Sequence, residues 1–304
     1  MRNRLLLVAA ALLFSTGGAA IKFASLSGWQ VASFRSAVAA VVLWAVVPQA
    51  RRAWHWGMVP VGAAYAATLI LFVLANRLTT SANAIFLQSC APVCVLLLAP
   101  VVLHEPIRRA DVWYILAVGL GLALFFVGRD TAVATAPDPP RGNLLGLGSG
   151  VAYALMLVGL RWHGRRGVRD SGIGIVVLGN LMAFALALPM ALPLGGLGGR
   201  DAAAIVYLGA VQIGLAYWCL TRALRYVPAF EATAMLQLEP AMSPVWTWLV
   251  YRERPTAWAL AGGAAIVSAT LANTWWSRRG RTECATTESR VNLKPVALPR
   301  SGPV

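Results

Sequence analysis

Charged residues are scarce in this chain of 304 residues, since Asp, Glu, Lys and Arg together make up only 12% of it. Soluble domains carry about 25% charged residues, so a water-soluble globular protein is excluded. Acidic residues are the rarest, with 11 Asp and Glu against 26 Lys and Arg. Disorder is excluded for nearly all of the chain, because 59% of the residues are hydrophobic and the mean hydropathy is +0.67.

Cysteine and histidine are also rare, with 4 Cys and 3 His in the whole chain. A metal site needs such residues clustered at ligand spacing, but His55, His104 and His163 all lie near the ends of hydrophobic segments. The Gly-rich run at 146–150 follows no strand, so it does not indicate a nucleotide-binding loop. We therefore expect no metal and no cofactor.

Long hydrophobic runs occupy most of the chain. A transmembrane helix needs about 20 apolar residues, and ten stretches of that order are separated by short polar breaks. They lie at 5–21, 36–50, 53–76, 78–104, 112–128, 142–160, 171–199, 202–221, 232–251 and 255–277. The runs do not alternate with the period of two that transmembrane β-strands require. The sequence predicts an all-α integral membrane protein with ten transmembrane helices.

The net charge of +15 is distributed in a way that indicates membrane topology. With the N-terminus in the cytoplasm, the loops on that side hold about twice as many Arg residues as the opposite loops. We therefore expect a multi-pass protein of the inner (plasma) membrane with both termini cytoplasmic. Residues 277–304 are expected to form a polar, disordered tail. The basic residues are expected to contact anionic lipid, not nucleic acid.

The chain contains an internal repeat at a shift of 148 residues. The shift aligns Ala75 with Ala223, Arg77 with Arg225, Ala84 with Ala232, Pro92 with Pro240, and Glu105 with Glu253. Each copy would contain five spans, an odd number, so the second copy enters the membrane with the opposite orientation. Inverted repeats of this kind place a substrate site near the middle of the bilayer and support alternating access.

The same regions resemble a known family. They are Leu13-Phe14-Ser15-Thr16-Gly17-Gly18, Phe34-Arg35-Ser36-Ala37, Ala91-Pro92-Val93 with His104-Glu105-Pro106, Leu238-Glu239-Pro240 and Tyr251-Arg252-Glu253-Arg254-Pro255. From about residue 4 to 276 the sequence resembles the EamA/RhaT branch of the drug/metabolite transporter (DMT) superfamily. The resemblance implies two inverted five-helix EamA repeats, at 4–128 and 142–276, and export or exchange of small metabolites. It leaves the substrate open.

Glu239 is the most informative polar residue, because it is expected near the middle of the ninth span. An ionised carboxylate there costs about 2.5–3.5 kcal/mol on insertion scales, so it should face a cavity, find a partner or be protonated. Such a group could alternately bind a proton and a substrate amine, which makes protons the candidate coupling ion. The structural alternative is a protonated Glu239 that bonds a carbonyl freed by Pro240. Pro92 and Pro240 are the expected helix breaks.

Other charged positions lie nearer the span ends. Arg35 could pair with Glu239, hold a substrate carboxylate or extend to the outer headgroups. Lys22 is expected to extend to the headgroups. Glu105 and Glu253 close the fourth and ninth spans, where ion pairs with loop Arg residues are expected. A gating role would require those pairs to break between conformations.

The remaining candidates are polar and aromatic residues deep in the spans. Ser15 and Thr16 precede Gly17-Gly18, which could loosen the first helix. Aromatic rings could stack on a cationic or amphipathic substrate, although each could equally serve helix packing. The full set of candidate binding or coupling residues is Glu239, Arg35, Gln88, Ser15, Thr16, Tyr65, Tyr153, Tyr217 and Trp218.

These features together predict a secondary active transporter that works by alternating access. The expected function is export of a small metabolite, such as an amino acid, a derivative or an amphipathic drug-like compound. An intramembrane enzyme is the first alternative, but no His lies mid-span to pair with a Ser nucleophile. A sensor or scaffold is the second.

Gly142, Gly146, Gly150 and Ala154 recur every four residues on the sixth span, which predicts a close-packing face.

Overall fold

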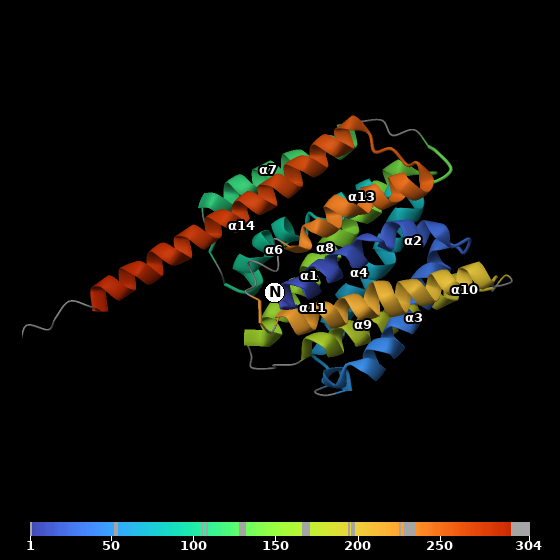
Figure 1. The fold of residues 1–304 in the computed structure, drawn as a ribbon, viewed down its shortest axis with the longest axis horizontal. Coiled ribbons are helices and arrows are strands. Elements are labelled where there is room, and N and C mark those ends of the chain that lie inside the picture. Colours follow the sequence, from blue (N-terminus) through green and yellow to red (C-terminus); the bar gives the residue numbers. More distant parts are fainter. Residues whose placement is uncertain are drawn as a thin grey trace, which may run out of the picture.

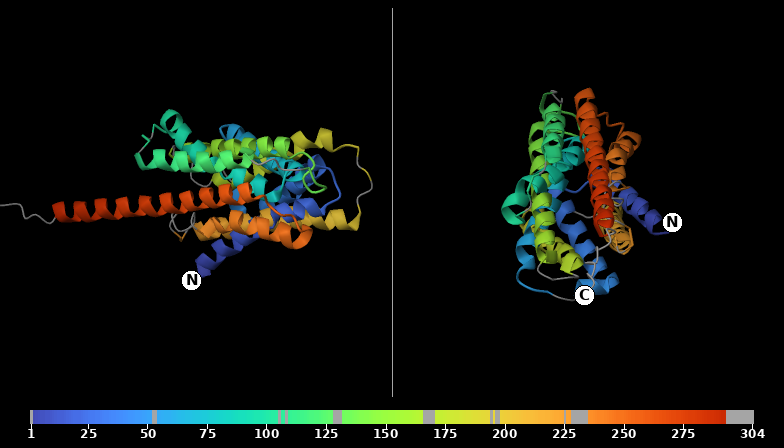
Figure 2. Two further views of the ribbon diagram at one scale, coloured as in Figure 1. Left: turned by 90° about the horizontal axis from the view of Figure 1, so that it is seen from above. Right: turned by 90° about the vertical axis from the view of Figure 1, so that its left-hand side faces the viewer.

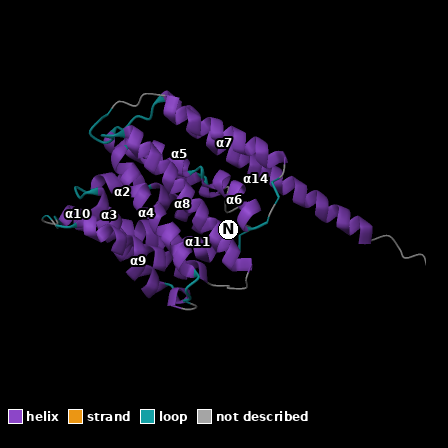
Figure 3. Cartoon of the chain, turned by 180° about the vertical axis from the view of Figure 1, so that it is seen from behind, coloured by secondary structure: helices purple, strands orange, loops and turns teal. Residues whose placement is uncertain are grey.

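The structure is a computed structural model. It describes residues 2–51, 54–104, 106–107, 109–127, 132–165, 171–193, 195, 198–224, 226–227 and 235–292. Helices make up nearly all of this part (Figure 3). Its one β-type pairing, within the residues just given, is an isolated bridge between Val133 and Ala136. The prediction of an all-α protein is therefore confirmed.

The helices follow the order of the predicted spans (Figure 1). They are α1 (Arg2–Ser15), α2 (Gly17–Phe23), α3 (Gly28–Val46), η1 (Pro48–Arg51), α4 (Met58–Leu78), α5 (Ser81–Gln88), α6 (Ala91–Val102), α7 (Arg109–Val127), α8 (Pro139–Arg165), α9 (Ser171–Ala191), α10 (Gly199–Val206), η2 (Tyr207–Leu215), α11 (Ala216–Leu224), α13 (Leu238–Tyr251) and α14 (Ala257–Asn292).

Seven helical segments in the described part are long and apolar enough to cross a membrane, and two shorter apolar helices lie at 111–127 and 257–273. The seven are Arg2–Phe23, Gly28–Val46, Met58–Leu78, Ser81–Val102, Pro139–His163, Gly172–Ala191 and Gly199–Leu220. The chain is therefore a multi-pass membrane protein.

The last helix is longer than the sequence predicted. α14 continues to Asn292, well into the segment expected to be a disordered tail, and it projects beyond the bundle (Figures 1 and 2). Once a helix exists, each further residue adds a backbone hydrogen bond, so a polar segment can extend an apolar one. Residues 293–304 lie outside the described part.

Several spans are interrupted within the bundle. α1 ends at Ser15 and α2 begins at Gly17, while α5 and α6 are separated by a turn ahead of Pro92. Proline lacks a backbone N–H and clashes with the preceding turn, so a helix tends to stop or restart there. A turn residue also precedes α13, whose first turn contains Pro240. The 9-residue π-helix η2 is a fourth irregularity.

Helices from the two halves of the sequence interleave (Figures 1 and 2). α3 packs against α9, and α7 against α14. α4 packs against α8, and α1 against α11. These contacts are related by the sequence repeat. In the repeat, α1 corresponds to α8, and α4 corresponds to the α10–η2–α11 segment. The α4–α8 contact of one half therefore has its counterpart in the α11–α1 contact. Likewise, α5 and α6 pack on α8 as α13 packs on α1 and α2.

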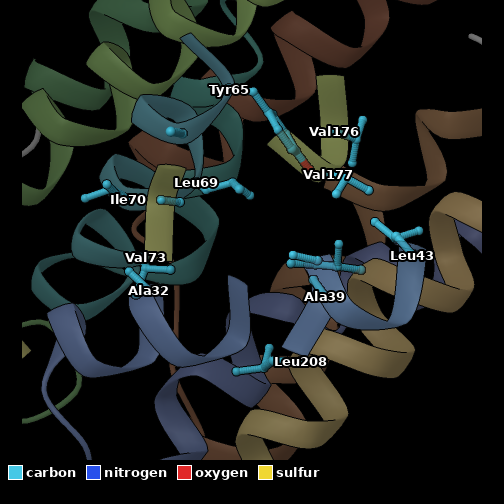
Figure 4. Packing of buried hydrophobic residues seen from close by; sticks show 14 of the residues in the cluster. Ala32, Ala39, Leu43, Tyr65, Leu69, Ile70, Val73, Val176, Val177 and Leu208 are labelled. Atoms are coloured by element: carbon cyan, nitrogen blue, oxygen red, sulfur yellow. The ribbon is translucent and has the colours of Figure 1, made fainter. Parts of the chain in front are cut away.

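The largest hydrophobic core lies where α3, α4, α9 and η2 meet. Figure 4 shows its side chains, including Ala39, Leu69, Val176 and Leu208. Small residues on α8 allow close packing beside it. A Cβ added at Gly142 would lie 2.6 Å from the backbone nitrogen of Thr79. The predicted close-packing face of the sixth span is confirmed.

Candidate functional site

The break between α1 and α2 is held by side chains of two other helices. Nε1 of Trp246, on α13, donates to Oγ of Ser15 at 2.8 Å. Oγ1 of Thr16 lies 2.8 Å from the hydroxyl of Tyr207 on η2. The Ser15 and Thr16 hydroxyls each donate to a carbonyl three residues earlier, so both act as acceptors toward these aromatic partners. The two candidate residues therefore link three helices.

Tyrosines from α4, α8 and α11 gather nearby. The Tyr65 hydroxyl donates to the Tyr217 hydroxyl at 2.9 Å, which joins α4 to α11. The ring of Phe14, one residue before the helix break, packs edge-on against Tyr217 with centroids 5.2 Å apart. Tyr153 interacts electrostatically with Tyr65 and Glu239. The structure thus brings three of the predicted aromatic residues together.

Glu239 lies in the first turn of α13, directly after the turn at Gln237, so the ninth span is interrupted close to the break expected at Pro240. The helix starts at Leu238, so its unpaired backbone N–H groups and partial positive charge offset part of the cost of a carboxylate there. Glu239 interacts electrostatically with Tyr65, Tyr153 and Tyr217. Within the described part of the chain, its carboxylate has no hydrogen-bond or ion-pair partner.

Arg35 is buried, with 2% of its surface exposed, so the alternative that it extends to the headgroups is wrong. Its Nη2 donates to the carbonyl oxygen of Leu69 at 3.1 Å, and its Nε has no partner among the described residues. The guanidinium interacts electrostatically with Tyr65 and Tyr217. It does not form the suggested ion pair with Glu239, because the tight α3–α4–α9 packing holds it on α4.

Two predicted residues have other partners. Nε2 of Gln88 donates to Oγ of Ser149 at 2.8 Å, and that hydroxyl donates to the carbonyl of Thr68 at 3.1 Å. Gln88 therefore links α5 to α8. The guanidinium of Arg222 lies over the Trp218 ring, 5.3 Å from its centroid.

A cavity of about 340 Å³ lies between α2, α10, η2 and α13. Its lining includes Thr16, Tyr207, Trp246, Phe23 and Val250. Neither Tyr207 nor Trp246 was predicted from the sequence to be a site residue. The signal for Trp246 was its depth in the ninth span, since Trp is usually found at membrane interfaces. No local signal distinguished Tyr207.

One end of the bundle contains a buried ion pair that the sequence did not predict. Nζ of Lys22 lies 3.0 Å from Oε1 of Glu253, and both side chains are under 5% exposed. Lys22 therefore does not extend to the headgroups, and Glu253 pairs with a lysine on α2 instead of a loop arginine. Burial raises the pKa of the Glu253 carboxyl, although the ammonium opposes this shift. Glu105, its repeat counterpart, lies outside the described residues.

The Tyr65–Tyr217 hydrogen bond can be tested by a double-mutant cycle. Replacing either residue with Phe is expected to lower the free energy of unfolding by about 0.5–1.5 kcal/mol, the usual net value of one hydrogen bond. The double replacement should cost little more than one single replacement, because both remove the same bond. Unfolding in detergent micelles measures the effect. Tyr226→Phe, at an exposed tyrosine, is the control. Fully additive losses would contradict the bond.

A metal centre is not indicated in the part of the chain that the structure describes. It contains no group of three or more His, Cys, Asp or Glu residues placed to hold an ion. The described residues of the candidate site offer one carboxylate, one guanidinium and several phenolic hydroxyls. These groups can bind a charged or polar small molecule.

Comparisons with known proteins agree with this picture. The EamA-like transporter family model matches residues 2–127 and 140–275. The chain is 28% identical over 276 residues to the pseudopaline exporter CntI from two strains of Pseudomonas aeruginosa, which covers 88% of this chain and 94% of that protein. A chain with a solved crystal structure shares the fold at 19% identity, with a TM-score of 0.61 over 91% of this chain and 98% of the other.

Proposed function

Because this chain belongs to the EamA-like transporter family, we propose that it is a secondary active exporter of a small zwitterionic metabolite in the inner membrane. The similarity to proteins named pseudopaline exporters supports the direction of transport. The chain is a transporter and not an enzyme, as the sequence predicted. The proposed substrate is an amino acid or a derivative that carries both an amine and a carboxylate.

The proposed architecture is ten transmembrane helices in two inverted repeats, at 4–128 and 142–276, with both termini cytoplasmic. Its support is the pattern of helix contacts, in which each main contact has a counterpart when the halves are exchanged. Such pairing is expected of repeats related by a two-fold axis in the membrane plane. In alternating access, α1 and α2 of the first half would move relative to α11 and α13 of the second half, against which they pack.

The proposed substrate class rests on two charges that do not pair with each other. The Glu239 carboxylate and the Arg35 guanidinium both lie within electrostatic range of the Tyr65–Tyr217 pair. Buried charges are normally paired, so opposite charges left apart suit a ligand with opposite charges of its own. We assign the substrate amine to Glu239 and its carboxylate to Arg35, with the tyrosine rings packing on the carbon skeleton.

The proposed coupling uses the same carboxylate. When the substrate amine leaves Glu239, a lone buried anion is costly, so a proton takes its place. Exchange of an amine for a proton at one group is antiport. The alternative of a sensor or scaffold has no observation that favours it over transport.

The experiment that tests this function is an efflux comparison. Cells that express the protein and cells that carry the empty vector are compared by untargeted mass spectrometry of their media. We expect one or more compounds with an amine and a carboxylate to be enriched several-fold by the protein. If the enriched compounds carry only an amine or only a carboxylate, the proposed zwitterionic substrate class is wrong. Equal media, together with no uptake of the same compounds by proteoliposomes, would contradict export.

A further inference from the structure

The Lys22–Glu253 ion pair connects segments that are far apart in the sequence. Nζ of Lys22 also donates to the carbonyl oxygens of Thr79 at 3.0 Å and Thr135 at 2.6 Å. Oε1 of Glu253 accepts a second hydrogen bond from the backbone N–H of Ser81 at 3.1 Å. The pair thus joins α2, the α4–α5 turn, the segment before α8 and the end of α13. α2 and α13 belong to different repeats. The α4–α5 turn joins two successive spans, and the segment before α8 connects the two repeats.

The hydrogen-bonding groups of Lys22 and Glu253 are nearly all occupied by each other and by neighbouring backbone. Lys22 has three ammonium protons and three oxygen acceptors, so its hydrogen-bonding capacity is filled. Glu253 is filled on one side only, because Oε2 has no partner among the described residues. A buried ion pair is a poor source of net stability compared with apolar packing, so its retention is better explained by a switching role.

Two further sets of hydrogen bonds hold the chain just after α2, at the same end of the bundle as the ion pair. The carboxylate of Asp201, at the start of α10, accepts from the backbone N–H of Ser25 at 2.7 Å and from its hydroxyl at 2.6 Å. Nη2 of Arg77 donates to the carbonyl of Ala24 at 2.8 Å and to that of Leu26. All of these contacts hold the turn that follows α2. The end of α2 is therefore fixed from three sides.

The ion pair lies between the candidate site and the end of the bundle. Lys22 is six residues beyond Thr16, which is about 9 Å along a helix. Tyr251 donates to the carbonyl of Ala19 at 3.3 Å, between the two levels. The contacts made by Lys22 and Glu253 therefore lie one to two helical turns beyond Thr16, toward the end of α2.

We propose that Lys22 and Glu253 form the gate at this end of the transport path, a role that rests on the proposed transport function. The ion pair is intact when this end is closed, as in the present structure. It separates when α2 and α13 move apart, and the freed charges are then exposed to water that enters the opening. Lys22 and Glu253 act on the path and do not bind the substrate in the site.

The gate can be tested without knowing the cargo, by the rate at which a buried cysteine is modified. Ser81 is 1% exposed and touches the pair through its backbone, so Ser81→Cys is a small reporter beneath it. The protein is prepared in lipid nanodiscs, with its native cysteines replaced by Ala, and labelled with a water-soluble maleimide. We expect slow labelling when Lys22 and Glu253 are present.

Lys22→Met and Glu253→Gln are each expected to accelerate labelling at least about tenfold, because losing one partner of a buried ion pair strongly favours separation. The double variant leaves no lone buried charge and is the one best able to fold. It should label as fast as the faster single variant, because all three lack the same interaction. Arg161→Gln is the matched control, since Arg161 lies near the end of α8 as Lys22 lies near the end of α2, and it should not accelerate labelling at Ser81→Cys.

Parent-like labelling of the folded double variant would overturn the gate. So would equal acceleration by Arg161→Gln, because the effect would then be general loosening. These outcomes are independent of the efflux comparison. Export with unchanged labelling would reject the gate alone, whereas faster labelling in a protein that moves nothing would reject the transport function.

Discussion

Replacing Glu239 with Gln is expected to reduce export at least about tenfold, since hydrogen bonds to charged groups contribute about 1.5–3 kcal/mol. Gln keeps the size of the side chain but has no negative charge to offer a substrate amine and cannot exchange a proton. The amount of protein in the membrane should not fall, because Glu239 has no partner among the described residues whose loss would destabilise the fold. Efflux of the identified substrate and the membrane content of the protein are the two measurements.

A matched control for this experiment is Asp138→Asn. Asp138 pairs with Arg141 at 3.2 Å in an exposed ion pair, and exposed pairs contribute little. Its export should equal that of the parent. Asp at position 239 should retain pH-dependent export at a reduced rate, because it keeps the charge on a shorter side chain. If the Gln variant still exports with the pH dependence of the parent, Glu239 does not couple transport to protons.

Replacing Gly150 with Leu is expected to cost more than about 3 kcal/mol and to remove most of the folded protein, because the added side chain meets backbone that cannot move aside. A Cβ at this position would lie 2.8 Å from the carbonyl oxygen of Gln88 and 3.1 Å from that of Leu87. These carbonyls belong to the end of α5, where the helix is interrupted. α8 could no longer approach α5, and the Gln88–Ser149 hydrogen bond would be lost.

Gly119→Leu is the control for the packing effect. Nothing lies within 4 Å of a Cβ at Gly119, which is also in a helix. Both replacements gain the same intrinsic helix propensity, about 1 kcal/mol for Gly relative to good helix formers. The difference between the two variants therefore isolates the contact between α8 and α5. The yield of monodisperse protein and the thermal midpoint in detergent are compared, and equal midpoints would contradict the close approach.

The positions of the helices, one helix break and one packing face could be predicted from the sequence. The apolar runs predicted helices where the structure has them, because a chain inside a bilayer must satisfy its backbone groups within each segment. The break after Ser15 coincides with the Gly17-Gly18 pair. The four-residue spacing of small residues on α8 predicted a face that needs close approach, since such spacing depends only on helix geometry.

Partners across the bundle were not readable. Lys22 and Glu253 are separated by 231 positions, and each resembled a residue that extends to water near a span end. Arg35 and Glu239 were natural candidates for an ion pair, yet Arg35 donates to the carbonyl of Leu69 and does not pair with Glu239. Gln88 was a candidate binding residue, but its amide donates to Ser149 on α8. In each case the charge of a side chain and its depth in the span were predictable, but the residue that it contacts was not.

The sequence alone determined that the chain is a helical membrane protein of the transporter type, because composition, run length and repeat spacing are local or additive properties. Only the tertiary structure decided which polar groups meet. In the membrane, helices associate through van der Waals packing and a few hydrogen bonds, without a hydrophobic effect to select one face. The rotation and depth at which α2, α4 and α13 meet are therefore set by all of their contacts together. These contacts place Lys22 on Glu253, and they leave Glu239 without a partner among the residues that the structure describes.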